Sequence, residues 1–91
     1  MNPYEEMLKV IIKREFALLG RIQTREILKK LGIEIDNRGN PVNPDGIDLK
    51  KIDEILETFK KQIGFIGILV VKLPIRRIAI QNNIPVPRTI M

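Results

Sequence analysis

The sequence of 91 residues contains no cysteine and no histidine. A chain without cysteine forms no disulfides and no thiolate metal site, so nothing indicates an oxidising compartment. A chain without histidine lacks the commonest general base and a common zinc ligand. Hydrolytic triads and zinc sites are therefore excluded, and we expect a protein that is not an enzyme and has no cofactor.

The carboxylates do not form a catalytic or metal-binding cluster in place of the missing cysteine and histidine side chains. Asp45, Asp48 and Asp53 come closest to a cluster, but Asp45 lies in a turn-rich stretch and Asp48 precedes a helical pattern, where aspartate is common. A calcium-binding loop over this stretch would need ligands where Pro41 and Ile52 stand. The sequence therefore predicts no metal site.

Long apolar runs are also missing. The longest, Phe65 to Val71, is far too short to cross a bilayer, and Glu5 and Glu6 stand where a secretory signal carries positive charge. We therefore expect no membrane partner and a cytoplasmic location. A chain of this length forms a single domain, over 1–91, whose modest stability favours a homodimer.

Negative charge is absent from the last third of the chain, because no acidic residue follows Glu57. The net charge is +3 over 1–32, −2 over 33–63 and +4 over 64–91. A surface of one sign predicts a polyanionic partner. Abundant isoleucine, lysine and glutamate are also typical of thermophile proteins. Some of the lysines would then contribute to thermal stability and not to ligand binding. The cations after Glu57 are Lys60, Lys61, Lys72, Arg76, Arg77 and Arg88.

The first element that the sequence predicts is a helix over 5–19. Asn2 and Pro3 suit the start of a helix, as the capping residue and the first-turn residue. Apolar residues then recur every three or four positions until Gly20, which is typical of a helix with one face on a core.

Two further helices are expected, over 24–31 with Thr24 as the cap and over 48–63 with Asp48 as the cap. Residues 21–23 are too short to classify and could form one short strand. Between the two helices, 33–47 is rich in glycine, proline and asparagine and is expected to be an irregular loop. It could hold a small hairpin that turns at the segment Asn37 to Asn40.

Beyond residue 64 the pattern favours strands, because isoleucine and valine crowd the segment. We expect two antiparallel strands, over 66–72 and 76–81, with a turn near Pro74. The alternative is a helix over 65–82 that breaks at Pro74, which periodicity alone does not exclude. The tail over 83–91 is expected to be extended, because its two prolines suit neither a helix nor a central strand.

The order of these elements resembles the winged helix-turn-helix superfamily. The resemblance is carried by the Gly20-Arg21-Ile22 bridge into the segment Thr24 to Gly32, and by Ile63-Gly64-Phe65-Ile66 before the hairpin. It implies an α+β fold with a three-helix core and a C-terminal two-stranded antiparallel hairpin. It also implies a small transcription regulator that binds double-stranded DNA, with the third helix in the major groove and the hairpin on phosphates.

The resemblance assigns roles to six cations. Lys72, Arg76 and Arg77 would contact phosphates from the hairpin, while Arg25, Lys50 and Lys51 would lie near the groove. An alternative explanation for the three hairpin cations is protection of a strand edge.

A second functional hypothesis is a non-catalytic protein-interaction module, the accessory subunit of a larger complex. Its apolar segment Phe65 to Val71 and its proline-rich tail would dock on a larger protein partner.

Overall fold

The computed structural model describes residues 2–91, and in this range the chain forms four α-helices, one short hairpin and a C-terminal 3-10 helix. The elements in chain order are α1 (Pro3–Leu19), α2 (Arg21–Lys30), β1 (Glu34–Ile35), β2 (Pro41–Val42), α3 (Leu49–Ile63), α4 (Ile66–Gln81) and η1 (Arg88–Ile90).

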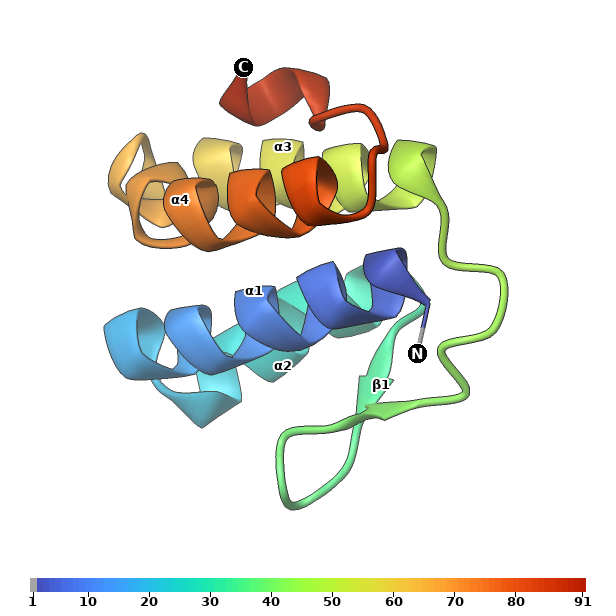
Figure 1. Cartoon of the computed structure of the whole chain (residues 1–91). Helices are drawn as coiled ribbons and strands as arrows, with labels where there is room; N and C mark the ends of the chain where they lie inside the picture. The colour runs from blue at the N-terminus through green and yellow to red at the C-terminus, as the bar shows by residue number, and fades with distance from the viewer. Residues whose placement is uncertain (1) are drawn as a thin grey trace.

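The helices form two pairs, each joined by a tight corner (Figure 1). Gly20 alone connects α1 to α2, and Gly64 with Phe65 connects α3 to α4. The β-hairpin and the loop that follows it link the two pairs, and α1 and α4 run antiparallel where the pairs meet. The tail after α4 turns back so that η1 lies over α3.

One apolar core lies between the two pairs. Its side chains repeat every three or four residues along each helix, which is the period that puts them on one face. Phe59 is the largest fully buried side chain. The other core residues are Met7, Leu8, Ile11, Ile12, Ile27, Leu28, Ile33, Ile52, Ile55, Leu56, Ile68, Val71, Ile75, Ile78, Ala79 and Ile90.

The predicted caps of the first and third helices are confirmed. The Asn2 side chain accepts a hydrogen bond from the backbone N–H of Tyr4 at 2.7 Å, and the Asp48 side chain accepts one from Lys51 at 2.9 Å. Each bond satisfies an amide at a helix start that has no partner within the helix.

The cap expected at Thr24 is wrong, and 21–23 does not form the short strand that was considered possible, because α2 already begins at Arg21. Gly20 has φ +88°, and this left-handed conformation reverses the chain within one residue. Thr24 is buried inside α2, where its hydroxyl donates a hydrogen bond to the Gly20 carbonyl at 2.8 Å.

A small hairpin forms within 33–47, with Glu34 opposite Val42 and Ile35 opposite Pro41. Its turn is held by Asp36, whose carboxylate accepts the backbone N–H groups of Arg38 at 2.8 Å and Asn40 at 2.9 Å. The bond from Asn40 is the main reason why the pKa of Asp36 lies below its usual value.

The predicted C-terminal hairpin is wrong, because 66–81 is one continuous helix that passes through Pro74. The expected fold class, a three-helix core with a C-terminal two-stranded hairpin, is therefore wrong as well. Burial explains the outcome: Ile68, Val71 and Ile75 all reach the core only if the chain is helical. This packing outweighs both the preference of isoleucine and valine for strands and the backbone hydrogen bond that proline removes.

The tail is extended from Ile84 to Pro87 and then forms η1, which places Ile90 in the core. Thr89 fastens the tail to α3. Its backbone N–H donates to Asp53 Oδ1 at 2.8 Å, and its hydroxyl lies 2.7 Å from the same oxygen and 3.0 Å from Glu57 Oε1. The tail therefore covers one side of α3.

We predict that Thr89→Val lowers the free energy of unfolding by about 1 kcal/mol, because the hydroxyl bond to a carboxylate is lost. Thr58→Val is the matched control, since the Thr58 hydroxyl only donates to the Glu54 carbonyl within α3. Urea denaturation of both variants measures the difference. Equal effects of the two substitutions would contradict a fastening role for Thr89.

Candidate functional site

The helix α4 has one face on the core and one face on the surface. Its buried residues include Ile68, Val71, Ile75 and Ile78, which recur at helical spacing. Its exposed residues recur at the same spacing on the other side. All of them except Gln81, the last residue of the helix, form what we call the outer face of α4, namely Ile66, Leu69, Leu73, Arg76, Arg77 and Ile80.

The outer face is unusually apolar for a surface. The side chains of Leu73 and Ile80 are 70% and 71% exposed, and those of Ile66 and Leu69 are about half exposed. A shallow groove of about 420 Å³ lies among Leu73, Arg76, Arg77, Ile80 and Gln81. Single exposed leucines are normal, but a row of four along one helix indicates a binding surface.

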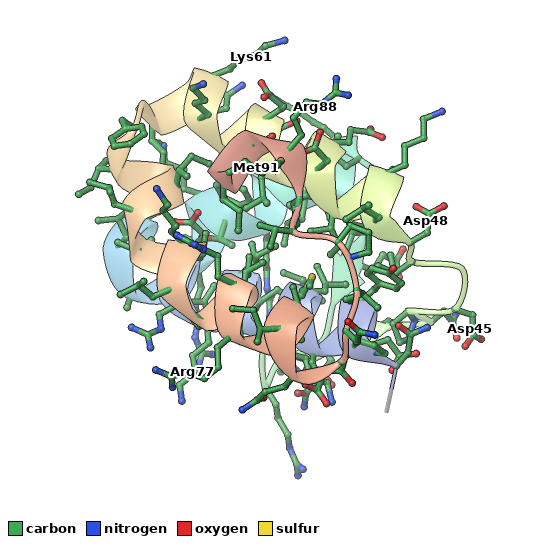
Figure 2. All side chains as sticks on the ribbon, turned by 45° about the horizontal axis from the view of Figure 1, so that its top comes forward. Asp45, Asp48, Lys61, Arg77, Arg88 and Met91 are labelled. Carbon is green, nitrogen blue, oxygen red and sulfur yellow. The ribbon has the colours of Figure 1, made fainter. Side chains whose placement is uncertain are left out.

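The same face is positively charged. Arg76 and Arg77 are exposed, and Lys72 is half-buried one turn before Arg76. No acidic residue occurs anywhere in α4. Within residues 2–91 the only ion pair closer than 4 Å joins Lys51 to Glu54, so these three cations have no carboxylate partner there. Figure 2 shows Arg77 pointing away from the body, on the other side of the view from Arg88.

Lys72, Arg76 and Arg77 thus all lie on α4, which is a helix and not a hairpin, and Arg76 and Arg77 line the groove. Arg25 lies on α2, where its guanidinium donates a hydrogen bond to the Asp36 carbonyl at 2.7 Å and so helps to hold the β-hairpin. Its Nε is buried without a hydrogen-bond partner. A contact of Arg25 with DNA stays a prediction.

Lys50 and Lys51 lie in the first turn of α3, on a different helix from Lys72, Arg76 and Arg77. Lys51 pairs with Glu54 at 3.5 Å, and Lys50 is exposed. Further along α3, Asp53 and Glu57 contact the tail through Thr89. The tail covers this side of α3, so this side is not free to enter a DNA groove.

The sequence analysis missed Leu73 and Ile80, and it included Ile66 and Leu69 only as part of the apolar segment Phe65 to Val71. The signal was their spacing, because positions 66, 69, 73 and 80 lie on one side of a helix and 68, 71, 75 and 78 on another. A strand assignment hides this pattern.

One titratable group lies in the interior. Glu15 of α1 is fully buried, and both of its carboxylate oxygens lack a hydrogen-bond partner. Burial disfavours the charged form and raises the pKa of Glu15 to about 8.

Residues 2–91 contain no group of three or more acidic side chains that could hold a metal ion. None of the helices in this range is long and apolar enough to cross a membrane. Comparisons of the chain with protein-family models, with curated proteins and with solved structures find no match.

Proposed function

We propose that this protein is a non-catalytic interaction module that binds an acidic amphipathic helix of a partner protein on the outer face of α4. The observation that carries the proposal is the exposed row of Ile66, Leu69, Leu73 and Ile80 on a helix whose only charges are positive. A partner helix would cover this row with its apolar side and place carboxylates opposite Arg76 and Arg77.

Charge argues against a second copy of the chain as the occupant. If two copies of α4 paired in antiparallel fashion about Leu73, Arg77 of each copy would face Leu69 of the other. Arg76 and Arg77 of both copies would then share one interface, and α4 supplies no carboxylate to offset them. Homodimerisation through another surface stays a prediction.

Duplex DNA is less well matched to this face than an acidic helix is. Phosphate contacts need cations, and here apolar side chains occupy most of the row. The hairpin that was expected to carry the phosphate contacts is a helix, and α3 is covered on one side by the tail. Binding of double-stranded DNA stays a prediction, but the segment expected to form the DNA-binding hairpin is a helix.

The test uses two designed helical peptides of the length of α4, both with leucines at positions three and four apart. One has glutamates beside the leucines and the other has lysines. We predict that the protein binds the glutamate peptide at least about tenfold more tightly, because only that peptide complements the arginines. Isothermal titration calorimetry measures both affinities.

The double variant Arg76→Glu and Arg77→Glu should reverse the preference and bind the lysine peptide more tightly. Arg88→Glu is the control, because Arg88 is exposed but lies on the tail. Equal affinity for the two peptides, or an unchanged preference in the double variant, would rule out the proposed surface. Concentration-dependent dimerisation that Leu73→Asn abolishes would instead identify a second copy as the occupant.

A further inference from the structure

A second surface, on the opposite helix pair, combines a hollow with four cations. A pocket of about 620 Å³ lies where α1, the α1–α2 corner and the turn of the β-hairpin meet. Lys9 and Lys13 of α1, Arg21 of α2 and Arg38 of the turn line it, over an apolar base that includes Phe16 and Ala17. Among residues 2–91, no acidic residue lines this pocket. We call it the basic pocket.

The walls of the basic pocket are fixed to one another through Phe16. Gly39 in the turn has φ +83°, and a Cβ atom at this position would lie 2.9 Å from the Phe16 ring, so the turn packs closely on α1. The Arg21 guanidinium lies 5.7 Å from the centre of the same ring and donates a hydrogen bond to the Asn37 carbonyl at 3.2 Å. The pocket is therefore formed before any ligand arrives.

The charges in the basic pocket are only partly offset by their neighbours, because Glu5 and Glu6 lie four and three residues before Lys9 on α1. Lys9 and Lys13 are four residues apart on α1, a spacing at which like charges destabilise a helix. Lys13 has no acidic residue three or four positions away in either direction. In the turn, the Asp36 carboxylate accepts hydrogen bonds from the backbone N–H groups of Arg38 and Asn40, although it also attracts Arg38. A bound anion would relieve the repulsion that remains.

The start of α2 adds to the positive field. Gly20 and Arg21 line the pocket, and α2 begins there without a side-chain cap. The first amides of a helix carry partial positive charge and have no partner within the helix. This contribution has the same sign as that of the four side chains.

We propose that the basic pocket binds the phosphate group of a small phosphate-bearing ligand. Several cations without a carboxylate, on a preformed hollow, suit a multiply charged oxyanion. The volume lies in the range of pockets that hold small molecules and cofactors. A free polyphosphate, a nucleotide and a nucleic-acid backbone share this chemistry, and the experiment separates them.

The test titrates the whole protein with inorganic pyrophosphate, with ATP in the absence of divalent ions, and with a short DNA duplex. The variant is the double substitution Lys9→Glu and Lys13→Glu. Its control is Lys29→Glu and Lys30→Glu, which makes the same change in net charge at two exposed residues of α2 that do not line the pocket. We expect the Lys9 and Lys13 variant to lose at least about tenfold in affinity for the preferred ligand and the control less than about twofold.

The ligand that binds most tightly identifies the source of the phosphate group. Binding of pyrophosphate or ATP with the expected difference between the variants supports the proposal. Three outcomes would overturn it, namely no binding of any of the three ligands, equal losses in the two double variants, or binding of the duplex alone. Amide chemical shifts of Gly20, Arg21 and Gly39 give a second readout, since a bound anion should move these resonances first.

Discussion

Replacing Glu15 with leucine should stabilise the protein, and should do so more strongly as the pH rises. Glu15 is fully buried and both oxygens lack partners, so the native state must keep the carboxyl group neutral or hold an unpaired charge. Leucine has a similar size and fills the same space without this penalty. Denaturant titration of Glu15→Leu measures the gain.

The pH dependence follows from the raised pKa. The pKa of Glu15 rises from 4.5 to about 8, so the native state keeps a proton that the unfolded state has already released. The stability of the natural protein is therefore complete below pH 4.5, falls between pH 4.5 and about 8, and stays low above that range. Between about pH 5 and pH 8 we expect the natural protein to lose about 3 kcal/mol relative to Glu15→Leu.

Glu15→Gln separates charge from polarity. It has no titrating group, so its stability should not show the fall with pH that Glu15 causes, although the buried amide still lacks a partner. A pH dependence that is the same in all three proteins would contradict the burial of Glu15 between the helices.

Ile90→Ala and Ile80→Ala should differ by several kcal/mol although the chemical change is identical. Ile90 is 1% exposed and packs in the core, so its truncation leaves a cavity and should cost about 2–4 kcal/mol. Ile80 is 71% exposed, and its truncation should change the free energy of unfolding by less than about 0.5 kcal/mol.

Comparing the two variants tests both the exposure of Ile80 on the outer face of α4 and the docking of the tail through Ile90. A large cost at Ile80 would place that side chain in the core and remove it from the outer face of α4. A small cost at Ile90 would mean that the tail does not dock on the helices. Thermal or urea unfolding of the two variants gives the result directly.

The first and third helices were predictable because several local signals agree there. Asn2 and Asp48 each provide a capping oxygen, and a glycine follows each helix at residues 20 and 64. Between these limits the apolar residues keep a single helical period. Agreement among cap, period and terminator leaves little for the rest of the chain to decide.

The fourth helix was predicted only as an alternative, with a break at Pro74 that does not occur, because its local preferences conflict. Its isoleucines and valines favour a strand, Pro74 disfavours a helix, and Phe65 provides no capping side chain. What decides the outcome is contact with α1 and α3, which buries Ile68, Val71 and Ile75 on one face. Such contacts join residues that are distant in the chain, so no local pattern contains them.

The candidate site was predictable only in part for the same reason. Charge alone identified Lys72, Arg76 and Arg77, and these residues do lie on one element. The apolar residues of the outer face form one row only when the segment is a helix, since a hairpin would have made Leu73 a turn residue. The hydrogen bond from Arg25 to the Asp36 carbonyl, eleven positions away, was not predictable, because no local pattern indicates that the hairpin packs beside α2.

Methyl NMR of the isoleucine and leucine side chains during titration with the glutamate peptide tests the central claim most directly. We predict that the resonances of Ile66, Leu69, Leu73 and Ile80 shift together, while those of the buried residues Ile52 and Ile55 of α3 do not. Shifts that avoid these four residues, or no shifts at all, would contradict the claim that the outer face of α4 binds an acidic helix.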